Sequence, residues 1–422
     1  MSTKKFNQQN KILVIVIGGG FGGLAAIKRL AKVDAIEILL IDSNNYHCFQ
    51  PLLYQVATAG LNPGDISISF RSIFLNDPNI SILNAEVFKI DLDMQEVYFE
   101  QQKRKFDYVI FSTGAEPNYF NHPEWKVNVL ELKSVDDAIK IRNTLLKIFE
   151  KKELINDKDI QIGIIGGGAT GIELAGSIAE FCHFTAKNGF RNIKPNKTKI
   201  YLFEKSHNIL ASFGERLSGK ATEYLKQLGI TVMTDSNILE IQAHHILLEN
   251  NSFELDMIIW TAGVKARSGI FVPELERDQS QRIFVTDDLS IKGYRNSFVI
   301  GDQANSHVTP FPAIAPLAMQ QGRQVAKNII ADQANRPRSA FQYKDKGSMA
   351  VIGRKYAVAH LAGFKFSGLL AWLIWCFAHI SPLIGFRSKI IVLFEFLWSY
   401  LHYKKGVRII TKFIFLIFLT LN

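Results

Sequence analysis

Short apolar runs, glycine-rich turns and helical patterns follow one another twice in the first half of the chain. The runs at 11–17 and 160–165 are rich in β-branched residues and too short for a helix, so each predicts a strand. After each turn, apolar residues return at helical spacing, over 24–33 and 172–181. The pattern therefore predicts a strand, a turn and a helix in two places, as in an α/β fold.

Both turns contain the spacing G-x-G-x-x-G. The glycines are Gly18, Gly20 and Gly23 in the first turn and Gly166, Gly168 and Gly171 in the second. Bare backbone at a strand-to-helix turn lets a pyrophosphate approach the positive end of the helix. One such match could be a tight packing turn, but two matches in register indicate dinucleotide binding.

An acidic residue is expected at the end of the next strand, where it can accept both ribose hydroxyls of a dinucleotide. Asp42 lies 19 residues after Gly23, whereas the second candidate, Glu204, lies 33 residues after Gly171. We interpret the polar, basic stretch 183–199 as an insertion between helix and strand, which explains the delay.

A further pair of similar segments supports a duplication. The segments Phe111–Pro117 and Ile259–Lys265 each follow an apolar run, and Thr113 precedes Thr261 by 148 residues, the offset that also separates Gly18 from Gly166. We therefore expect two dinucleotide-binding units of one ancestry, with electrons passing between two bound dinucleotides.

The first unit is expected to be interrupted by the second, because a closing strand for it is found only at Arg295–Asn305. In flavoproteins with two dinucleotides, an acid such as Asp302 after this strand commonly reaches FAD. The expected domains are an FAD-binding domain in two parts, an NADH-binding domain and a membrane-anchoring region, at 1–123 with 289–340, at 124–288, and at 341–422.

Composition allows several cores and suggests no metal site. The 422 residues are 47% hydrophobic, and Cys48, Cys182 and Cys376 are far apart with no C-x-x-C pair. Isolated reduced thiols are therefore expected rather than disulfides or zinc. The first ten residues lead directly into the first strand, so no secretory signal is expected.

The net charge of +10 is concentrated in the C-terminal region. Residues 354–422 contain nine lysines and arginines against one glutamate, a net +8, among apolar and aromatic segments. This combination suits an anionic membrane surface, where each basic residue contributes about 1 kcal/mol, and it argues against nucleic acid as the partner.

The segment Phe366–Phe386 has 21 residues without a formal charge, which reaches the length of a membrane-spanning helix. Pro382 and Gly385 would break it, so we expect a helix, a turn and a second helix from about Arg387. Attachment at the membrane interface is favoured, and a membrane span or a soluble dimer interface are the alternatives.

Taken together, these motifs resemble the type II NADH dehydrogenases, which are single-subunit NADH:quinone oxidoreductases that do not pump protons. The resemblance extends from Lys11 to about Thr411 and includes NYHCFQPLLYQVATAGLNPGDI, GGGATGIELAG, VIGDQA, AIAPLAMQQGRQVAKNI and YKDKGSMAVIGRKYAVA. It implies a two-dinucleotide flavoprotein fold with two Rossmann-like domains and C-terminal membrane-associated helices. It further implies FAD, NADH and a membrane quinone, a homodimer, and monotopic attachment to the cytoplasmic face of the cell membrane in a respiratory chain.

The resemblance also implies roles for three residues. Glu173 would face the reacting rings, although an acid in the first helical turn can serve only the helix dipole. Gln320, with Gln321 beside it, would meet the quinone or flavin, and Lys365 would lie near the flavin. The family often has A-Q-x-x-x-Q in this helix, whereas Pro316 follows Ala315 here, so the role of the first glutamine does not carry over.

The predicted cofactor-binding residues are mostly glycines and strand-end acids. They are Gly18, Gly19, Gly20, Phe21, Gly22, Gly23, Asp42, Ser43, Val87, Thr113, Gly114, Gly166, Gly168, Gly171, Glu204, Gly263, Gly301, Asp302 and Ala318. Small Ala318 and Gly322 are expected to let backbone approach the flavin, and Tyr46, Phe49, Pro51 and Tyr54 to pack beside its ring. The rival functions are a sulfide:quinone oxidoreductase, which would need cysteines close to the flavin, and a flavin-binding membrane sensor without turnover.

Overall fold

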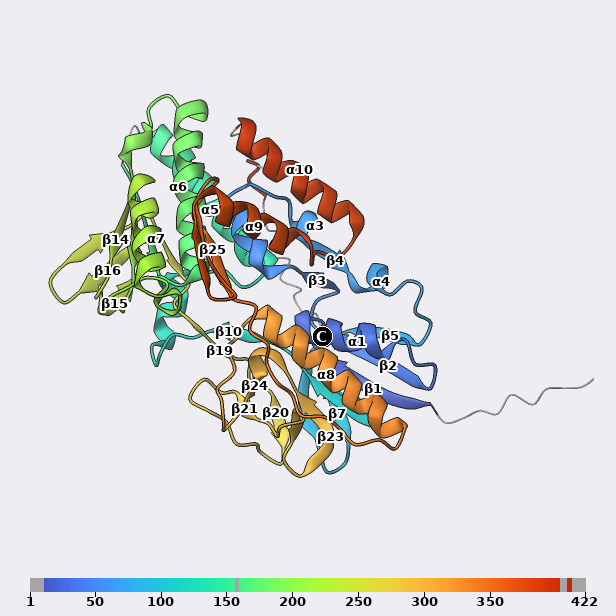
Figure 1. Cartoon of the computed structure of the whole chain (residues 1–422). Helices are drawn as coiled ribbons and strands as arrows, with labels where there is room; N and C mark the ends of the chain where they lie inside the picture. The colour runs from blue at the N-terminus through green and yellow to red at the C-terminus, as the bar shows by residue number, and fades with distance from the viewer. Residues whose placement is uncertain (1–10, 156–158, 403–407, 412–422) are drawn as a thin grey trace, which may run out of the picture. The chain divides into compact units, whose positions relative to one another are not determined.

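The computed structural model describes residues 11–155, 159–402 and 408–411 (Figure 1). Two compact units are present, and each is discontinuous in sequence. Unit 1 consists of Met1–Cys48, Ser67–Asn118 and Gly263–Lys346, and unit 2 consists of Phe49–Ile66, Tyr119–Ala262 and Gly347–Asn422. Residues 263–288, which the sequence prediction assigned to the inner domain, thus belong to unit 1, and 49–66 belong to unit 2. The functional assignment of the predicted domains stays a prediction.

Unit 1 is built on a mostly parallel six-stranded sheet. The strand order is β22-β23-β9-β1-β2-β5, and only β22 runs antiparallel to its neighbour. The late strand β23 pairs with β9, which confirms that the first unit is closed by a strand beyond the second nucleotide motif. The bounds are β1 Ile12–Ile17, β2 Ile36–Asp42, β5 Ile80–Asn84, β9 Tyr108–Phe111, β22 Ser290–Ile291 and β23 Tyr294–Val299.

Two helices of unit 1 pack against each other, α1 (Phe21–Leu30) and α8 (Ala315–Gln333). A second sheet of unit 1 has the order β20-β6-β7-β8, and three strand pairs complete the unit. These smaller elements are β3 Tyr46–Cys48, β4 Ser67–Ser69, α4 Phe70–Ile73, β6 Val87–Asp91, β7 Glu96–Phe99, β8 Gln102–Lys105, β10 Ala115–Pro117, β19 Val264–Ala266, β20 Ile270–Val272, β21 Ile283–Phe284, η5 Gly301–Gln303 and β24 Ala304–Asn305.

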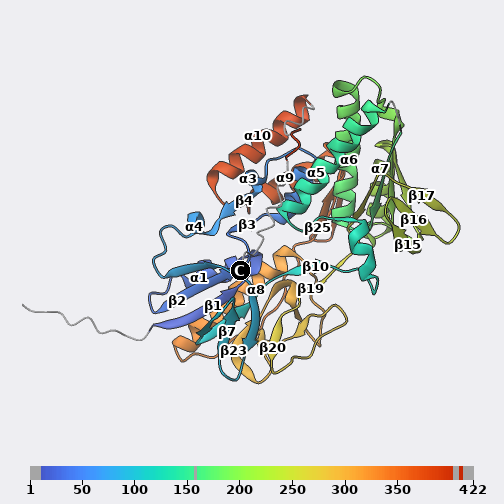
Figure 2. The ribbon, with the colours of Figure 1, turned by 180° about the vertical axis from the view of Figure 1, so that it is seen from behind.

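Unit 2 repeats the parallel architecture with a five-stranded sheet in the order β11-β18-β12-β13-β14. A three-stranded antiparallel meander, β15-β16-β17, lies beside it (Figure 2). The strands are β11 Leu130–Glu131, β12 Ile160–Ile165, β13 Thr198–Phe203, β14 Ile230–Met233, β15 Ile238–Gln242, β16 His245–Leu248, β17 Ser252–Glu254 and β18 Met257–Trp260. The other elements are η1 Gln50–Leu52, α2 Leu53–Ala57, α3 Pro63–Ile66, η2 Pro123–Asn128, α5 Val135–Leu154, α6 Ala169–Gly189, η3 Pro195–Lys197, η4 Ala211–Phe213 and α7 Glu215–Gln227.

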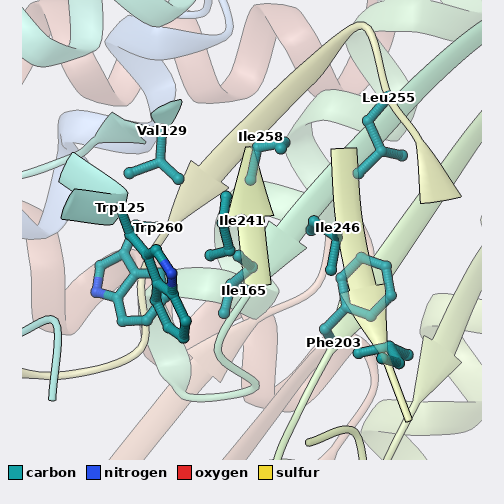
Figure 3. Close-up of a cluster of buried hydrophobic side chains, with 10 residues drawn as sticks. Trp125, Val129, Ile165, Phe203, Ile241, Ile246, Leu255, Ile258 and Trp260 are labelled. Atoms are coloured by element: carbon teal, nitrogen blue, oxygen red, sulfur yellow. The ribbon is translucent and has the colours of Figure 1, made fainter. Parts of the chain in front are cut away.

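Ten buried apolar side chains join the meander to one face of this sheet (Figure 3). Trp125 and Trp260 contact each other with ring centroids 5.7 Å apart, and Ile246 of the meander is fully buried. Burial of side chains of this size contributes about 1.5–3 kcal/mol each. This core holds the ends of β12 and β18, which bear the second glycine turn and Thr261.

The C-terminal part of unit 2 is an antiparallel sheet followed by two helices. Its elements are β25 Ser348–Val351, β26 Ala357–Leu361, β27 Phe364–Ser367, α9 Leu369–Ile380 and α10 Phe386–His402. The break between α9 and α10 contains Pro382 and Gly385, which confirms the predicted helix–turn–helix. The terminal apolar segment 412–422, which contributed to the membrane prediction, lies outside the described residues.

Candidate functional site

The first glycine turn is shaped by contacts that only glycine allows. Gly18 has φ +97°, and a Cβ there would lie 2.5 Å from the carbonyl oxygen of Ser112. A Cβ on Gly23 would lie 2.0 Å from the Gly18 carbonyl oxygen. A Cβ on Gly20, by contrast, would meet no atom within 4 Å. The turn therefore packs tightly against β9 and leaves open space in front of Gly20, at the start of α1.

The second turn reproduces this geometry in unit 2. Gly166 has φ +110°, and a Cβ on Gly171 would lie 1.9 Å from the Gly166 carbonyl oxygen. Again the middle of the motif is open, because a Cβ on Gly168 would meet nothing within 4 Å. Each turn thus presents free space at a helix N-terminus, which is where backbone N–H groups bind phosphate.

Asp42 and Glu204 occupy equivalent places. Asp42 Oδ2 accepts the N–H of Gly19 at 2.6 Å and its Oδ1 accepts the N–H of Asn44 at 2.7 Å. Glu204 Oε2 accepts the N–H of Gly167 at 2.6 Å, and its Oε1 accepts the N–H of Ser206 at 2.7 Å. The late position of Glu204 in the sequence therefore does not displace it from the strand end. A carboxylate has about four acceptor positions, so both acids keep acceptors for ribose hydroxyls.

The predicted insertion before β13 differs in form from the expectation. Helix α6 continues to Gly189, so the polar residues 183–189 extend the helix, and only the following residues form a connection. The stretch 183–199 thus consists of the last turns of α6 and the connection to β13, and its interpretation as an insertion stays a prediction.

The pairing of Thr113 with Thr261 is wrong by one residue. Thr261 Oγ1 donates to the carbonyls of Ile165 and Gly166, at 2.8 and 3.2 Å. In the first copy these bonds, to Ile17 and Gly18, come from Ser112 Oγ, at 3.0 and 2.8 Å. The equivalent of Thr261 is therefore Ser112. Serine and threonine both supply the hydroxyl, so matching the letters of the two segments selected the wrong neighbour.

The residues of unit 1 fit a flavin nucleotide. Besides the open space at Gly20, Gln321 of α8 is fully buried, and its Oε1 accepts the N–H of Gly301 at 2.6 Å. Its Nε2 is buried without a hydrogen-bond partner, which leaves a donor beside Gly301 for a ligand. Ala318 approaches the same turn, since a Cβ on Gly301 would lie 3.3 Å from its methyl group.

Gly322 lies at the contact between α8 and α1. A Cβ there would lie 2.1 Å from the carbonyl oxygen of Gly22, and a Cβ on Gly22 would lie 3.2 Å from the Ala318 carbonyl oxygen. The small residues on α8 therefore allow close packing against α1. Gly322 therefore serves a helix–helix contact within unit 1, and the expectation that it lets backbone approach the flavin stays a prediction.

Gln320 lies one residue from Gln321 but has different partners. Its Nε2 donates to the Lys344 carbonyl and its Oε1 accepts the Lys344 N–H, both at 3.0 Å. The amide thus ties residue 344 to α8. Helical spacing contained the signal that separates the two glutamines, because Ala318, Gln321 and Val325 follow one buried stripe.

Glu173 is buried in unit 2, with 8% of its surface exposed. Burial raises the pKa of its carboxyl to about 8, and the N–H of Val351, which donates to Oε1 at 3.3 Å, opposes this rise. Trp375 Nε1 and Tyr54 Oη are themselves buried without hydrogen-bond partners. Glu173 therefore retains its proton near neutral pH, which is unusual for an acid at the start of a helix.

The other predicted residues are distributed over both units. Lys365 is exposed on β27, and its Nζ would lie 3.3 Å from a Cβ on Gly214. Phe49, Pro51 and Tyr54 belong to unit 2, where Tyr54 and Trp375 have ring centroids 6.4 Å apart. The rest of the predicted set lies in unit 1: Phe21, Ser43, Tyr46, Val87, Thr113, Gly114, Gly263 and Asp302.

Two cysteines lie in environments that suppress thiol reactivity. Burial raises the pKa of the Cys48 thiol to about 11 and that of Cys376 to about 12. Cys182 is buried within α6. The reactive thiolate needs a lowered pKa, so Cys48 and Cys376 do not suit the sulfur chemistry of the rival function.

Helices α9 and α10 expose apolar side chains along one stripe each. On α9 these include Phe377, 76% exposed, and on α10 they include Phe386 and Phe394, 80% and 63% exposed. The remaining members are Leu369, Leu370, Leu373, Ile390, Leu393, Leu397 and Trp398. Within the described part of the chain, no helix combines the length and hydropathy that crossing a membrane requires.

Residues 13–322 match the pyridine nucleotide-disulphide oxidoreductase family, and residues 346–403 match the NDH2 C-terminal domain. The type II NADH:quinone oxidoreductase Ndh of Mycobacterium tuberculosis is 36% identical over 94% of this chain and 90% of the relative. The type II NADH:quinone oxidoreductase NdhA of the same organism is 34% identical over 94% of this chain and 89% of the relative.

Solved structures show the same fold. NDH2 from Plasmodium falciparum, solved in complex with NADH, has a TM-score of 0.84 at 21% identity, with 95% of this chain and 100% of that chain covered. The sulfide:quinone oxidoreductase of Aquifex aeolicus has a TM-score of 0.70 at 17% identity, with 92% and 91% covered. The two matched glycine turns with their acids, and the relatives that share them along nearly the whole chain, establish that this chain belongs to the type II NADH:quinone oxidoreductases.

Proposed function

We propose that the protein oxidises NADH with a membrane quinone, with FAD bound in unit 1 and NADH in unit 2, and without pumping protons. The observation that supports this proposal is the repetition of one nucleotide turn in two units, each with a strand-end acid and open space at the helix N-terminus. When bound, FAD would supply the two-electron chemistry that links a hydride donor to a quinone.

In unit 1, the chain's own residues bind and orient the flavin nucleotide. The N–H groups at the start of α1 would bind the pyrophosphate in the open space in front of Gly20. Asp42 would accept the ribose hydroxyls, and Gln321 Nε2, which is buried without a partner beside Gly301, would donate to the nucleotide. Asp302, in the same turn as Gly301, would hold the ribityl chain or the pyrophosphate, as in flavoproteins with two dinucleotides.

In unit 2, the start of α6 and Glu204 hold NADH in the corresponding way. Glu173, two residues after Gly171, keeps a proton on its carboxyl near neutral pH. A neutral carboxyl beside the nicotinamide adds no negative charge to the site as NADH gives up its hydride. Lys365 is an exposed cation of the same unit and is proposed to act near the flavin, as the family resemblance implies.

Helices α9 and α10 are proposed to attach the protein to an anionic phospholipid surface on the cytoplasmic face of the cell membrane. Their exposed apolar stripes would enter the interface, and the basic residues Arg387 and Lys389 would meet lipid phosphates. Quinone would then enter from the lipid side. The family resemblance also implies a homodimer. Sedimentation of the purified protein in detergent would test this oligomeric state.

A pair of matched variants tests the proposed function. Gly20→Val and Gly168→Val each add a side chain at an extended backbone where the Cβ meets no atom within 4 Å. The full-length variants are purified, their FAD content is measured, and oxidation of NADH by a short-chain quinone is followed. Gly20→Val should lose FAD, whereas Gly168→Val should retain FAD and lose NADH binding.

The outcomes separate the alternatives. If Gly20→Val retains FAD or Gly168→Val still oxidises NADH at the wild-type rate, the assignment of the two turns is wrong. If NADH bleaches the flavin absorbance of the wild-type protein and quinone does not restore it, the protein is a sensor without turnover. If sulfide bleaches it and NADH does not, the sulfide:quinone rival is correct.

A further inference from the structure

Both backbone groups of Gly19, in the first glycine turn, have a side-chain hydrogen-bond partner. Its N–H donates to Asp42, and its carbonyl oxygen lies 3.0 Å from Nδ1 of His47. Because a carbonyl oxygen can only accept, Nδ1 carries the proton. His47 is part of β3, is 5% exposed, and meets the ring of Phe21 edge to face with centroids 5.2 Å apart.

In the second turn, a different donor binds the equivalent carbonyl, that of Gly167. The Gly167 N–H donates to Glu204, and the Gly167 carbonyl accepts the N–H of Leu210 at 2.9 Å. Leu210 has φ +48°, in the left-handed region that residues with a Cβ rarely adopt. One copy therefore uses a buried imidazole, and the other a strained backbone, to supply a donor to the same carbonyl. Two different solutions at one position indicate that the orientation of this peptide matters.

The affected group is the next N–H along the chain. A trans peptide is planar, so the carbonyl of Gly19 and the N–H of Gly20 point in opposite directions. A hydrogen bond from His47 to the carbonyl thus fixes the direction of the Gly20 N–H, in the residue that faces open space. In unit 2, Leu210 fixes the Gly168 N–H in the same manner.

We propose that His47 is a positioning residue for the flavin nucleotide, whose Nδ1–H aims the Gly20 N–H at the pyrophosphate. This inference rests on the proposed placement of FAD in unit 1. Burial lowers the pKa of His47, and Lys28 of α1 lowers it further, against the opposing effect of the Gly19 carbonyl. The ring is therefore neutral at pH 7 and keeps one tautomer, which makes it a fixed donor.

Two substitutions separate the donor from the ring. His47→Phe keeps an aromatic ring against Phe21 and removes the N–H, whereas His47→Asn removes the ring and keeps an amide donor near the Nδ1 position. Each full-length holoprotein is diluted, and release of FAD is followed by the rise of its fluorescence. Loss of a buried hydrogen bond should make His47→Phe release FAD about 5- to 150-fold faster, whereas His47→Asn should stay within about 5-fold of wild type.

Two results overturn the inference: His47→Phe releasing FAD at the wild-type rate, or His47→Asn releasing it as fast as His47→Phe. If His47→Phe does not fold, the test rests on His47→Asn. This variant lacks the ring, so slow release of FAD from it would be explained by the remaining donor to the Gly19 carbonyl. The NADH dissociation constant of FAD-loaded His47→Phe should match wild type, since the second turn uses Leu210. Retention of FAD by Gly20→Val would instead contradict the placement of FAD, so the two failures are distinguishable.

Discussion

Glu173 and Glu180 lie on one face of α6, and both accept backbone N–H groups from the same short segment of unit 2. Val351 N–H donates to Glu173 at 3.3 Å and Arg354 N–H donates to Glu180 at 2.8 Å. Between them, a Cβ on Gly176 would lie 2.9 Å from the nitrogen of Gly353. The helix therefore receives residues 351–354 along about two turns, with an acid at each end and a glycine at the closest approach.

The raised pKa of Glu173 predicts a pH dependence of stability. Between its ordinary value of 4.5 and its folded value of about 8, the folded protein binds more protons than the unfolded chain. The free energy of unfolding should therefore fall as pH rises through this window. Glu173→Gln cannot ionise, so its stability should lack this pH dependence. Its melting temperature should therefore rise relative to that of the wild-type protein between pH 5 and pH 8. If the melting temperatures of both proteins change equally with pH over that range, Glu173 is already ionised in the folded state.

Glu180 is predicted to be a structural acid. In Glu180→Ala the N–H of Arg354 loses its acceptor in a partly buried position, which should cost about 1 kcal/mol of unfolding free energy. Hydrogen exchange should accelerate at residues 351–354 and remain unchanged in unit 1. Glu180→Gln keeps an acceptor and serves as the control. Unchanged exchange in Glu180→Ala would mean that the segment is held by other contacts.

Glu204 should make the enzyme prefer NADH. A carboxylate that accepts ribose hydroxyls repels a 2′-phosphate, so kcat/KM for NADH should exceed that for NADPH by at least about tenfold. Glu204→Ala should lower kcat/KM for NADH and bring it closer to kcat/KM for NADPH. Glu240→Ala removes the same charge from an exposed position on β15 of the same unit and should leave the ratio unchanged. Equal use of both nucleotides by the wild-type protein would contradict the role of Glu204.

The sequence predicted features whose cause is local. Gly18 and Gly23 are required because a side chain on either would strike backbone within the same turn or the adjacent strand end, so spacing alone locates the turns. The break between α9 and α10 was likewise predictable, since Pro382 and Gly385 oppose a continuous helix. Local sterics act over a few residues, and a pattern of letters records them.

Features that depend on distant backbone were missed. His47 donates to Gly19, 28 residues earlier, and Glu180 accepts from Arg354, 174 residues later. No spacing rule connects a side chain to a main-chain atom at such separations, because the fold alone brings them together. The exchange of Ser112 for Thr113 has another origin: both residues offer a hydroxyl, and only the register of β9 against β1 distinguishes them.

The exposed stripes of α9 and α10 predict binding to anionic vesicles with two separable components. Phe377→Ser with Phe394→Ser removes apolar area and should reduce co-sedimentation with both neutral and anionic vesicles. Arg387→Gln with Lys389→Gln should weaken binding to anionic vesicles only, by roughly 30-fold at about 1 kcal/mol per charge, and salt should mask the difference. A dimer that forms through the stripes, with no vesicle binding by the wild-type protein, would assign this surface to a second copy.

The neighbouring glutamines of α8 distinguish the family-implied role of Gln320 from the geometry. Gln320 has both amide atoms engaged by Lys344, whereas Gln321 keeps a buried donor without a partner beside Gly301. We therefore expect Gln321→Ala to slow the recovery of flavin absorbance by quinone about 5- to 150-fold, or to release FAD, because a donor to the ligand is lost. Gln320→Ala should change that recovery by less than about 3-fold, since the partner of Gln320 is the backbone of Lys344, which water can satisfy at a half-exposed position.

Anaerobic stopped flow measures bleaching by NADH and recovery by quinone separately, and NADH bleaching should be nearly unaffected in Gln320→Ala. If Gln320→Ala alone slows recovery, the quinone contact belongs to Gln320, and its bond to Lys344 must open during turnover.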